Sequence, residues 1–347
     1  MKLHMESLVN RTKFRLMLIL VFGTLSLIGL FIYSLTVGSY HIGWYDAISA
    51  FFSAVSNGGE TSTTDERIVY LVRFPRFLAA VGVGIGLAIA GVVMQAIVRN
   101  PLVDPYVTGV SSGASFGAVS FMMLGFMSGT MAVYALPISA FVGAVAAFFI
   151  TIGISEASGG RPITFVLSGV IVGFAFSSLT NILVVENPDH LKGVLFWMFG
   201  SLTAPDITQC AILLFTVGIV GAVVLVYARE LNVILLGEEQ GSQLGVNVRK
   251  VKLLMMVMSS IMTAACVAFT GVIAFLGLIV PHMARMLVGG DHRLLLPASI
   301  IIGANFLLAT DILCRFIGDL PIGAIVSLIG APFFGYLLIR RGKEYSN

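Results

Sequence analysis

Charged residues are scarce in this chain. Asp, Glu, Lys and Arg make up 11% of its 347 residues, whereas they make up roughly a quarter of an ordinary soluble domain. Hydrophobic residues reach 58%, and the mean hydropathy is +1.00. A soluble fold of this size has no interior large enough for so much apolar surface. The composition therefore excludes a water-soluble protein and predicts one that crosses a membrane several times.

Groups that carry chemistry are equally sparse. The three cysteines, Cys210, Cys266 and Cys314, lie in apolar stretches without C-x-x-C spacing, so we expect buried thiols rather than a disulfide framework. The five histidines show no metal-ligand spacing, and no G-x-x-x-x-G-K-[ST] sequence occurs. We expect no metal site, no cofactor and no catalytic site. The net charge of +3 is typical of cytoplasmic loops and does not indicate nucleic-acid binding.

Apolar segments divide the chain into ten predicted membrane spans. The first has no signal-peptide cleavage site and is too long for the apolar region of a signal peptide, so we expect it to be retained. The run 253–287 exceeds one crossing, and its Gly and Pro residues predict a break into two helices. The other segments are Phe14–Val37, Phe77–Val98, Val107–Phe126, Met131–Ile154, Phe165–Val185, Cys210–Ala228, Pro297–Leu313 and Ile322–Ile339.

Lys and Arg set the predicted orientation. An even number of spans places both termini on one side, and fifteen of the 20 Lys and Arg residues then fall on that side. Because cytoplasmic loops carry the basic excess, we expect a multi-pass cytoplasmic (inner) membrane protein with both termini in the cytoplasm. The five basic residues on the outer side are Arg67, Arg73, Arg76, Lys192 and Arg315.

Three of these outer arginines adjoin the outer ends of helices. Arg73 and Arg76 precede the span that begins at Phe77, and Arg315 follows Asp311 by four residues, which allows an ion pair on one helix face. Such arginines can extend along the helix to lipid headgroups. They can equally receive the carboxylates of a protein partner. The pattern alone leaves both interpretations open.

Two further stretches bear on mechanism. The small residues of "GVGIGLAIAG" (82–91) predict close helix packing, because no strand precedes them and no phosphate motif follows. The largest inner loop, 229–252, contains a short helical piece from Glu238 to Leu244 with a stop signal at Gly245. This loop is either solvated or a docking helix for a cytoplasmic partner. Ionisable groups within the spans are few, which argues against an ion-driven carrier without excluding it.

Five long stretches resemble a known family. They are "VRFPRFLAAVGVGIGLAIAGVVMQAIVRNPLVDPYVTGVSSGASFGA", "LFWMFGSL", "LGEEQGSQLGV", "GVIAFLGLIVPHMARMLVGGDHRLLLPAS" and "DLPIGAIVSLIGAPFFGYLLIRR". In this order they resemble the permease subunits of type II ABC importers for iron–siderophore complexes, haem or vitamin B12 (the FecCD/BtuC-like family). The resemblance covers nearly all of 73–341.

The resemblance implies an all-α membrane protein with about ten transmembrane helices and inverted-repeat helix groups, as in the vitamin B12 permease. Residues 1–347 would form a single transmembrane permease domain, with 229–252 as its cytoplasmic coupling loop. The permease would pair with a second copy of itself. Two ABC ATPase subunits would dock on its cytoplasmic side, and an extracytoplasmic substrate-binding protein would dock outside.

The resemblance also assigns roles to residues. Those matching the arginines that receive glutamates of the binding protein are Arg73, Arg76 and Arg315. Those matching the ATPase coupling segment are Glu238, Glu239, Gln243, Leu244 and Gly245. Those near the cytoplasmic gate are Asn100, Ile163 and Thr164, although "GGRPITF" (159–165) departs from the usual residues before this helix.

We therefore expect a permease subunit that forms the path for a metal chelate (a ferric siderophore, haem or cobalamin) by alternating access, while a separate subunit hydrolyses ATP. Two alternatives stay open: an ion-gradient-driven secondary transporter, and an importer of the same family that carries an oxyanion such as molybdate.

Overall fold

The computed structural model describes residues 2–123, 130–188 and 191–345, and these contain helices but no strand. The helices that form the body of the protein are α1 (Lys2–Thr36), α4 (Phe74–Val98), α5 (Val110–Met123), α6 (Thr130–Ala157), α7 (Pro162–Glu186), α9 (Ile207–Val226), α12 (Val248–Thr270), α13 (Leu276–Val288), α14 (His292–Phe316) and α15 (Ile322–Tyr345). Short helices connect them: α2 (Trp44–Ser56), α3 (Thr64–Glu66), the π-helix η1 (Arg67–Arg73), the 3-10 helix η2 (Pro105–Thr108), α8 (Leu191–Met198), α10 (Ala228–Leu236) and α11 (Glu238–Gln243).

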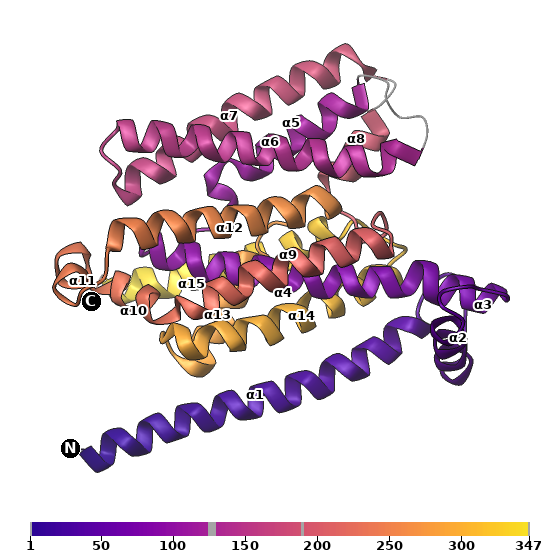
Figure 1. Ribbon diagram of the computed structural model, residues 1–347, viewed down its shortest axis with the longest axis horizontal. Helices are drawn as coiled ribbons and strands as arrows, with labels where there is room; N and C mark the ends of the chain where they lie inside the picture. The colour runs from indigo at the N-terminus through magenta and orange to yellow at the C-terminus, as the bar shows by residue number, and fades with distance from the viewer. Residues whose placement is uncertain (1, 124–129, 189–190, 346–347) are drawn as a thin grey trace.

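The long helices run roughly along one direction, so the molecule has two ends (Figure 1). The start of α1, the helices α10 and α11, and the end of α15 lie at one of them, which we call the α11 end. Helices α2, α3 and α8 lie at the other, the α2 end. The two termini therefore share an end, as the even number of predicted spans requires.

The predicted all-helical membrane fold is confirmed. Within the described residues, seven helices are long and apolar enough to cross a membrane, and three shorter apolar helices (α5, α13 and the first part of α15) accompany them. Each of the ten predicted spans coincides with one of these helices. The run 253–287 divides into α12 and α13 as expected, but its break lies between Thr270 and Leu276, whereas Gly277 and Pro281 lie inside α13.

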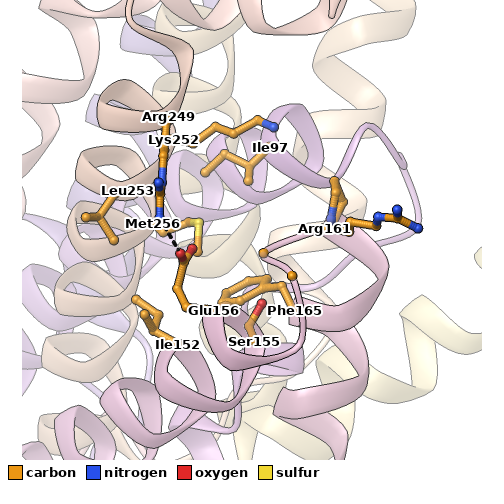
Figure 2. Close-up of a pocket in the computed structure, with 13 residues that line it drawn as sticks. Ile97, Ile152, Ser155, Glu156, Arg161, Phe165, Arg249, Lys252, Leu253 and Met256 are labelled. Carbon is orange, nitrogen blue, oxygen red and sulfur yellow. Dashed lines mark hydrogen bonds and ion pairs between the residues drawn. The ribbon is translucent and has the colours of Figure 1, made fainter. Parts of the chain in front are cut away.

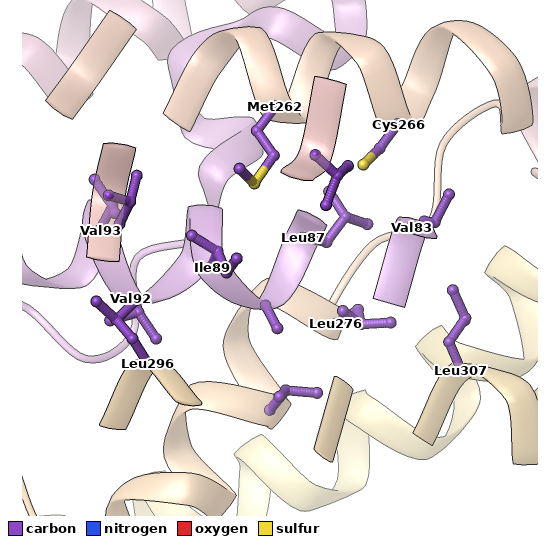
Figure 3. Packing of buried hydrophobic residues seen from close by; sticks show 14 of the residues in the cluster. Val83, Leu87, Ile89, Val92, Val93, Met262, Cys266, Leu276, Leu296 and Leu307 are labelled. Atoms are coloured by element: carbon purple, nitrogen blue, oxygen red, sulfur yellow. The ribbon is translucent and has the colours of Figure 1, made fainter. Parts of the chain in front are cut away.

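Helix α4 is the centre of the packing. In its most apolar 18-residue window, 78% of the residues are buried, whereas none are buried in the corresponding window of α1. Figure 3 shows Val83, Leu87, Ile89, Val92 and Val93 of α4 among Met262 and Cys266 of α12, Leu276 of α13, and Leu296 and Leu307 of α14. On the far side of α12, helices α5, α6 and α7 form a second group, and the core of this group also includes residues of α4 and α12 (Figure 1). All three cysteines are free and buried.

Glycine allows the close approach of helices around α4. A Cβ atom at Gly91 would lie 2.0 Å from the carbonyl oxygen of Gly277, and one at Gly84 would lie 2.4 Å from that of Gly303. These distances are far inside van der Waals contact, so any side chain there would push α13 or α14 away from α4. The packing role predicted for 82–91 is therefore confirmed.

Candidate functional site

The α2 end holds a cluster of charged residues that the fold brings together from distant parts of the chain. Arg76, in the first turn of α4, donates from Nε to Oδ1 of Asp311 at 2.7 Å. Arg315 donates from Nη2 to the other carboxylate oxygen, Oδ2, at 2.5 Å, which confirms the pair predicted from the four-residue spacing. Asp311 is fully buried. Two guanidinium groups thus share one carboxylate, and the arrangement satisfies charges that would otherwise be costly to bury.

Arg315 and a third arginine, Arg73, bind the backbone at the end of α1. Arg73 donates to the backbone carbonyls of Leu35 and Tyr40, and Arg315 donates from Nη1 to the carbonyl of Ser34 at 2.8 Å. The last carbonyls of a helix have no partner within the helix, and cationic groups near them interact favourably with the helix dipole. Arg73 and Arg315 therefore fix the end of α1 to η1 and α14.

The guanidinium groups of these arginines lie inside the protein and do not extend to its surface. Arg73 and Arg76 are 4% and 8% exposed, and the Arg315 side chain is 2% exposed. The structure brings the three predicted docking arginines together, and all three are bonded within the chain.

Asp319 is a member of this cluster that sequence reasoning missed. It accepts from Nη1 of Arg76 at 2.8 Å, and its side chain is 53% exposed. Its φ of 60° lies in the left-handed region, which Asp tolerates better than most residues. The only sequence signal for Asp319 is its position in a Gly-Asp turn two residues before Pro321. Through Asp319, the cluster reaches the surface.

At the α11 end, α11 projects between α10 and α12. Helix α11 ends at Gln243, one residue before the predicted Leu244, and Gly245 follows with a φ of 80°, as a helix stop requires. Glu239, Gln243, Leu244 and Gly245 are exposed, and Leu244 stands out as an apolar side chain that is 62% exposed. The side chain of Glu238 lies outside the described part of the structure. The predicted coupling segment is thus a helical turn with an apolar tip.

This turn is anchored firmly to its neighbours. A Cβ at Gly241 would lie 2.5 Å from Cγ2 of Val248, so α11 packs directly on the start of α12. Asn247 caps α12 by accepting from the amide of Lys250 at 3.1 Å. Helix α10, which the sequence did not predict, buries Leu231 and Ile234 in the main core. A force on α11 would therefore be transmitted to α10 and α12.

A cavity of about 540 Å³ opens beside α12 at the same end (Figure 2). Its walls come from four helices and from the turn between α6 and α7, and Arg249 donates across it to Oε2 of Glu156 at 2.8 Å. The lining residues are Ile97, Ile152, Ser155, Glu156, Gly159, Gly160, Arg161, Pro162, Phe165, Arg249, Lys252, Leu253 and Met256.

The predicted gate residues lie next to this cavity in the chain but do not line it. Ile163 is 61% exposed at the start of α7. Thr164 donates from Oγ1 to the carbonyl of Arg161 at 2.8 Å, and its Oγ1 lies 3.5 Å from Oγ of Ser155. Asn100 is exposed just beyond α4 and accepts from the amide of Leu102 at 3.0 Å. Their neighbours Ile97 and Phe165 do line the cavity.

Three polar residues at the α11 end, Asn232, Asp291 and Arg293, fix the start of α14. Asp291 accepts from Nη2 of Arg293 at 2.6 Å and from Nδ2 of Asn232 at 2.7 Å. Hydrogen bonds from the Arg293 side chain, helped by Asn232, lower the pKa of Asp291 from 3.8 to about 2. Within the described residues, no group of three or more His, Cys, Asp or Glu is placed to hold a metal ion.

The chain was compared with known proteins. Residues 25–340 match the model of the FecCD transport family. A cobalamin import system permease protein of Halobacterium salinarum is 42% identical over 277 residues, which are 79% of this chain and 74% of the relative. A hemin transport system permease protein of Yersinia pestis is 35% identical over 322 residues, 90% of this chain and 94% of the relative.

A solved structure gives the same result in three dimensions. An inward-facing conformation of a putative metal-chelate type ABC transporter superimposes with a TM-score of 0.81 at 31% sequence identity, covering 93% of this chain and 99% of that one. The helical fold, the family model and the relatives agree over nearly the whole length. The chain is therefore a multi-pass membrane permease subunit that belongs to the FecCD transport family.

Proposed function

We propose that this chain is the permease subunit of an ATP-driven importer and forms the path of a metal chelate by alternating access. The observation that carries this proposal is the family match over residues 25–340 of a chain whose helices have the composition of membrane spans. The chain contains no phosphate-binding motif for ATP, so a separate subunit would hydrolyse it. The permease itself would have no catalytic site.

The proposed assembly follows the two ends of the molecule. Residues 1–347 form one transmembrane domain in a homodimer, with the path between the two copies. The α11 end faces the cytoplasm, which the excess of Lys and Arg at this end supports. Two ABC ATPase subunits dock there, and a substrate-binding protein docks on the α2 end outside.

The coupling role of 229–252 is supported by the shape of α11. Leu244, which directly follows α11, is an exposed apolar group of the kind that fills a cleft on a protein partner. Leu244→Asp should reduce the amount of ATPase that co-purifies with the permease, because a charge replaces the apolar contact. The melting temperature of the permease alone should stay unchanged. Full co-purification of the ATPase with this variant would contradict the coupling role.

For docking, Arg76 is the arginine best placed to meet a partner carboxylate. Its bond to Asp311 is buried, whereas its bond to Asp319 leads to the surface. A glutamate of the binding protein could replace Asp319 on Nη1 while the buried bond stays intact. Arg73 and Arg315 would add positive potential and hold the surface in place. Charges of this kind act mainly on association rate and register.

A docking experiment tests this role while the stability of the fold is measured in parallel. Arg76→Gln should slow association with the binding protein roughly three- to ten-fold at low salt, measured on permease in nanodiscs whose thermal stability is recorded alongside. Arg67→Gln is the matched control, because Arg67 is an exposed arginine at the same end outside the cluster. Equal association rates for the two variants would remove Arg76 from the docking surface.

The cytoplasmic gate is proposed at Asn100, Ile163 and Thr164, where α4 ends and α7 begins. The exposure of Ile163 and Asn100 supports it, because gate residues must meet their counterparts in a second copy. In proteoliposomes that hold the ATPase, Ile163→Asp should raise the leak of a preloaded chelate in the absence of ATP. A leak equal to that of the unchanged chain would count against this gate.

The cargo would be a ferric siderophore, haem or cobalamin, and the names of the two relatives support this class. The deciding experiment is uptake into proteoliposomes that contain this chain, its ATPase and its binding protein. The panel is haem, cobalamin, ferric siderophores and molybdate, with and without ATP. Accumulation of one chelate only with ATP supports the proposal. Accumulation of molybdate favours the oxyanion importer, and accumulation that follows an ion gradient without ATP favours a secondary transporter.

A further inference from the structure

Two charged residues join the segment that follows α11 to the turn between α6 and α7. Arg249 is the second residue of α12, four positions after Gly245, and Glu156 is the second-last residue of α6. Their side chains meet at 2.8 Å across the cavity described above (Figure 2). The Arg249 side chain is 87% exposed and that of Glu156 is 47% exposed. The bond thus joins the C-terminal end of α6 to the N-terminal end of α12.

Two glycines shape the turn that Glu156 precedes. Gly159 and Gly160 have φ values of 94° and 63°, in the region that favours glycine. A Cβ at Gly159 would meet nothing within 4 Å, so no neighbouring side chain holds this position. The amides of Ser158 and Gly160 donate to the carbonyls of Ile154 and Ser155 at 3.0 and 2.9 Å. The turn 157–162 is therefore tied to the last turn of α6 and is open on its other side.

The contact between α6 and α12 changes along their length. Deeper in the protein, Ala144 and Phe148 of α6 share a core with Ala264 and Val267 of α12. At the α11 end the cavity lies beside these helices, and Ile152 and Met256 line it. There, the exposed Arg249–Glu156 bond adds a polar contact between the two helices.

The charges around the cavity favour this bond. Of the thirteen described residues that line the cavity, Glu156 is the one acid, while Arg161, Arg249 and Lys252 are basic. Arg161 belongs to the turn itself. If the carboxylate of Glu156 is neutralised, like charges on α12 and on the turn face each other across the cavity, which favours their separation.

We propose that Glu156 and Arg249 form a positioning pair that transmits displacement of α11 to the turn 157–162 and so to the start of α7. This inference rests on the proposed function, in which α11 receives the ATPase and the start of α7 belongs to the gate. When α11 moves, α12 moves with it because Gly241 packs on Val248. Arg249 then draws Glu156, and the turn follows through its bonds to the end of α6.

The transport test uses the assembled complex with its ATPase and binding protein. Glu156→Gln and Arg249→Gln should each lower the chelate imported per ATP hydrolysed by roughly two- to five-fold, the effect expected for an exposed ion pair. The charge-swapped double variant, Glu156→Arg with Arg249→Glu, should restore at least half of the loss. Arg293→Gln is the matched control, because it breaks an exposed ion pair at the same end that does not reach the turn.

A second measurement needs neither ATP nor partner subunits. In the purified chain in detergent, hydrogen exchange at the amides of Ser158 and Gly160 should be about two- to five-fold faster in either single variant than in the unchanged chain. The double variant should return to the original rate, and Arg293→Gln should leave it unchanged.

The two measurements separate this inference from the proposed function. If the unchanged complex imports nothing with ATP, the proposed function fails, and the exchange rates still decide whether the pair positions the turn. Exchange rates equal in all variants, or a double variant as impaired as the single ones, would overturn the positioning pair. Faster exchange in the single variants with normal import per ATP would overturn its role in transmission.

Discussion

The two ends of this permease use charge in opposite ways. At the α2 end, Arg76 and Arg315 share the fully buried Asp311, and Arg73 holds the end of α1. At the α11 end, Arg249 and Glu156 meet in an exposed pair beside a cavity and a glycine turn. Breaking a buried ion pair costs about 3–5 kcal/mol, whereas an exposed pair contributes about 0.2–1 kcal/mol. Breaking these charge contacts should therefore cost much more at the α2 end than at the α11 end.

The largest expected loss of stability comes from the buried cluster around Asp311 at the α2 end. Asp311→Ala should destabilise the protein by about 3–5 kcal/mol, because two buried guanidinium groups lose their shared carboxylate. Asp319→Asn is the matched control, since it removes the charge of a half-exposed partner of Arg76 and keeps a residue type that tolerates the left-handed backbone, and it should cost no more than about 1 kcal/mol. Thermal unfolding in detergent would measure both. Similar losses in the two variants would mean that the buried cluster does not hold the α2 end.

The next largest loss of stability is expected when glycines at the two ends are replaced by alanine. Gly271, beside α8, has a φ of 71°, and a Cβ there would lie 2.0 Å from the carbonyl oxygen of Trp197. Gly271→Ala should therefore cost about 2–4 kcal/mol through overpacking and backbone strain. Gly159, at the α11 end, has open space around it, so Gly159→Ala should cost only about 1–2 kcal/mol, from its backbone conformation alone. If unfolding experiments showed a larger loss for Gly159→Ala than for Gly271→Ala, the α2 end would not be the more tightly packed of the two.

The smallest effect concerns Asp291, which lies at the α11 end but is not part of the Arg249–Glu156 pair. Arg293 lowers the pKa of Asp291 to about 2, so the carboxylate stabilises the fold at pH values above its ordinary pKa of 3.8. This stabilisation is lost as the pH falls from about 4 to about 2. Asp291→Asn should melt slightly below the unchanged protein at neutral pH, and the difference should shrink over that interval. A difference that stays constant would mean that the charge of Asp291 is not the cause.

The sequence predicted the spans because lipid imposes a simple rule of length and hydropathy. It also predicted the Asp311–Arg315 pair and the short helix of α11, which depend on spacing within one segment. It did not predict α10, whose nine residues were assigned to the largest inner loop. Nor did it predict that Arg73 and Arg315 close the end of α1, or that Asp319 binds Arg76. These contacts join residues that lie far apart along the chain, and no local pattern specifies them.

The cavity and the Arg249–Glu156 bond could not be read from the sequence for the same reason. Residues 156 and 249 belong to different helices, and their separation depends on how α6 and α12 pack in the core. The roles of the docking, coupling and gate residues came from the family resemblance. Structure adds where these residues lie, and the experiments above test what they do.

The burial of the three native thiols has a practical consequence. Cys210, Cys266 and Cys314 are each at most 1% exposed, and a thiol must reach solvent to react with an alkylating reagent. Cysteines introduced at exposed positions, such as 159 or 249, can therefore carry fluorescent or spin labels without removal of the native ones. The alkylation rate of the native thiols then reports how often the surrounding helices separate, because each thiol reacts only when they do.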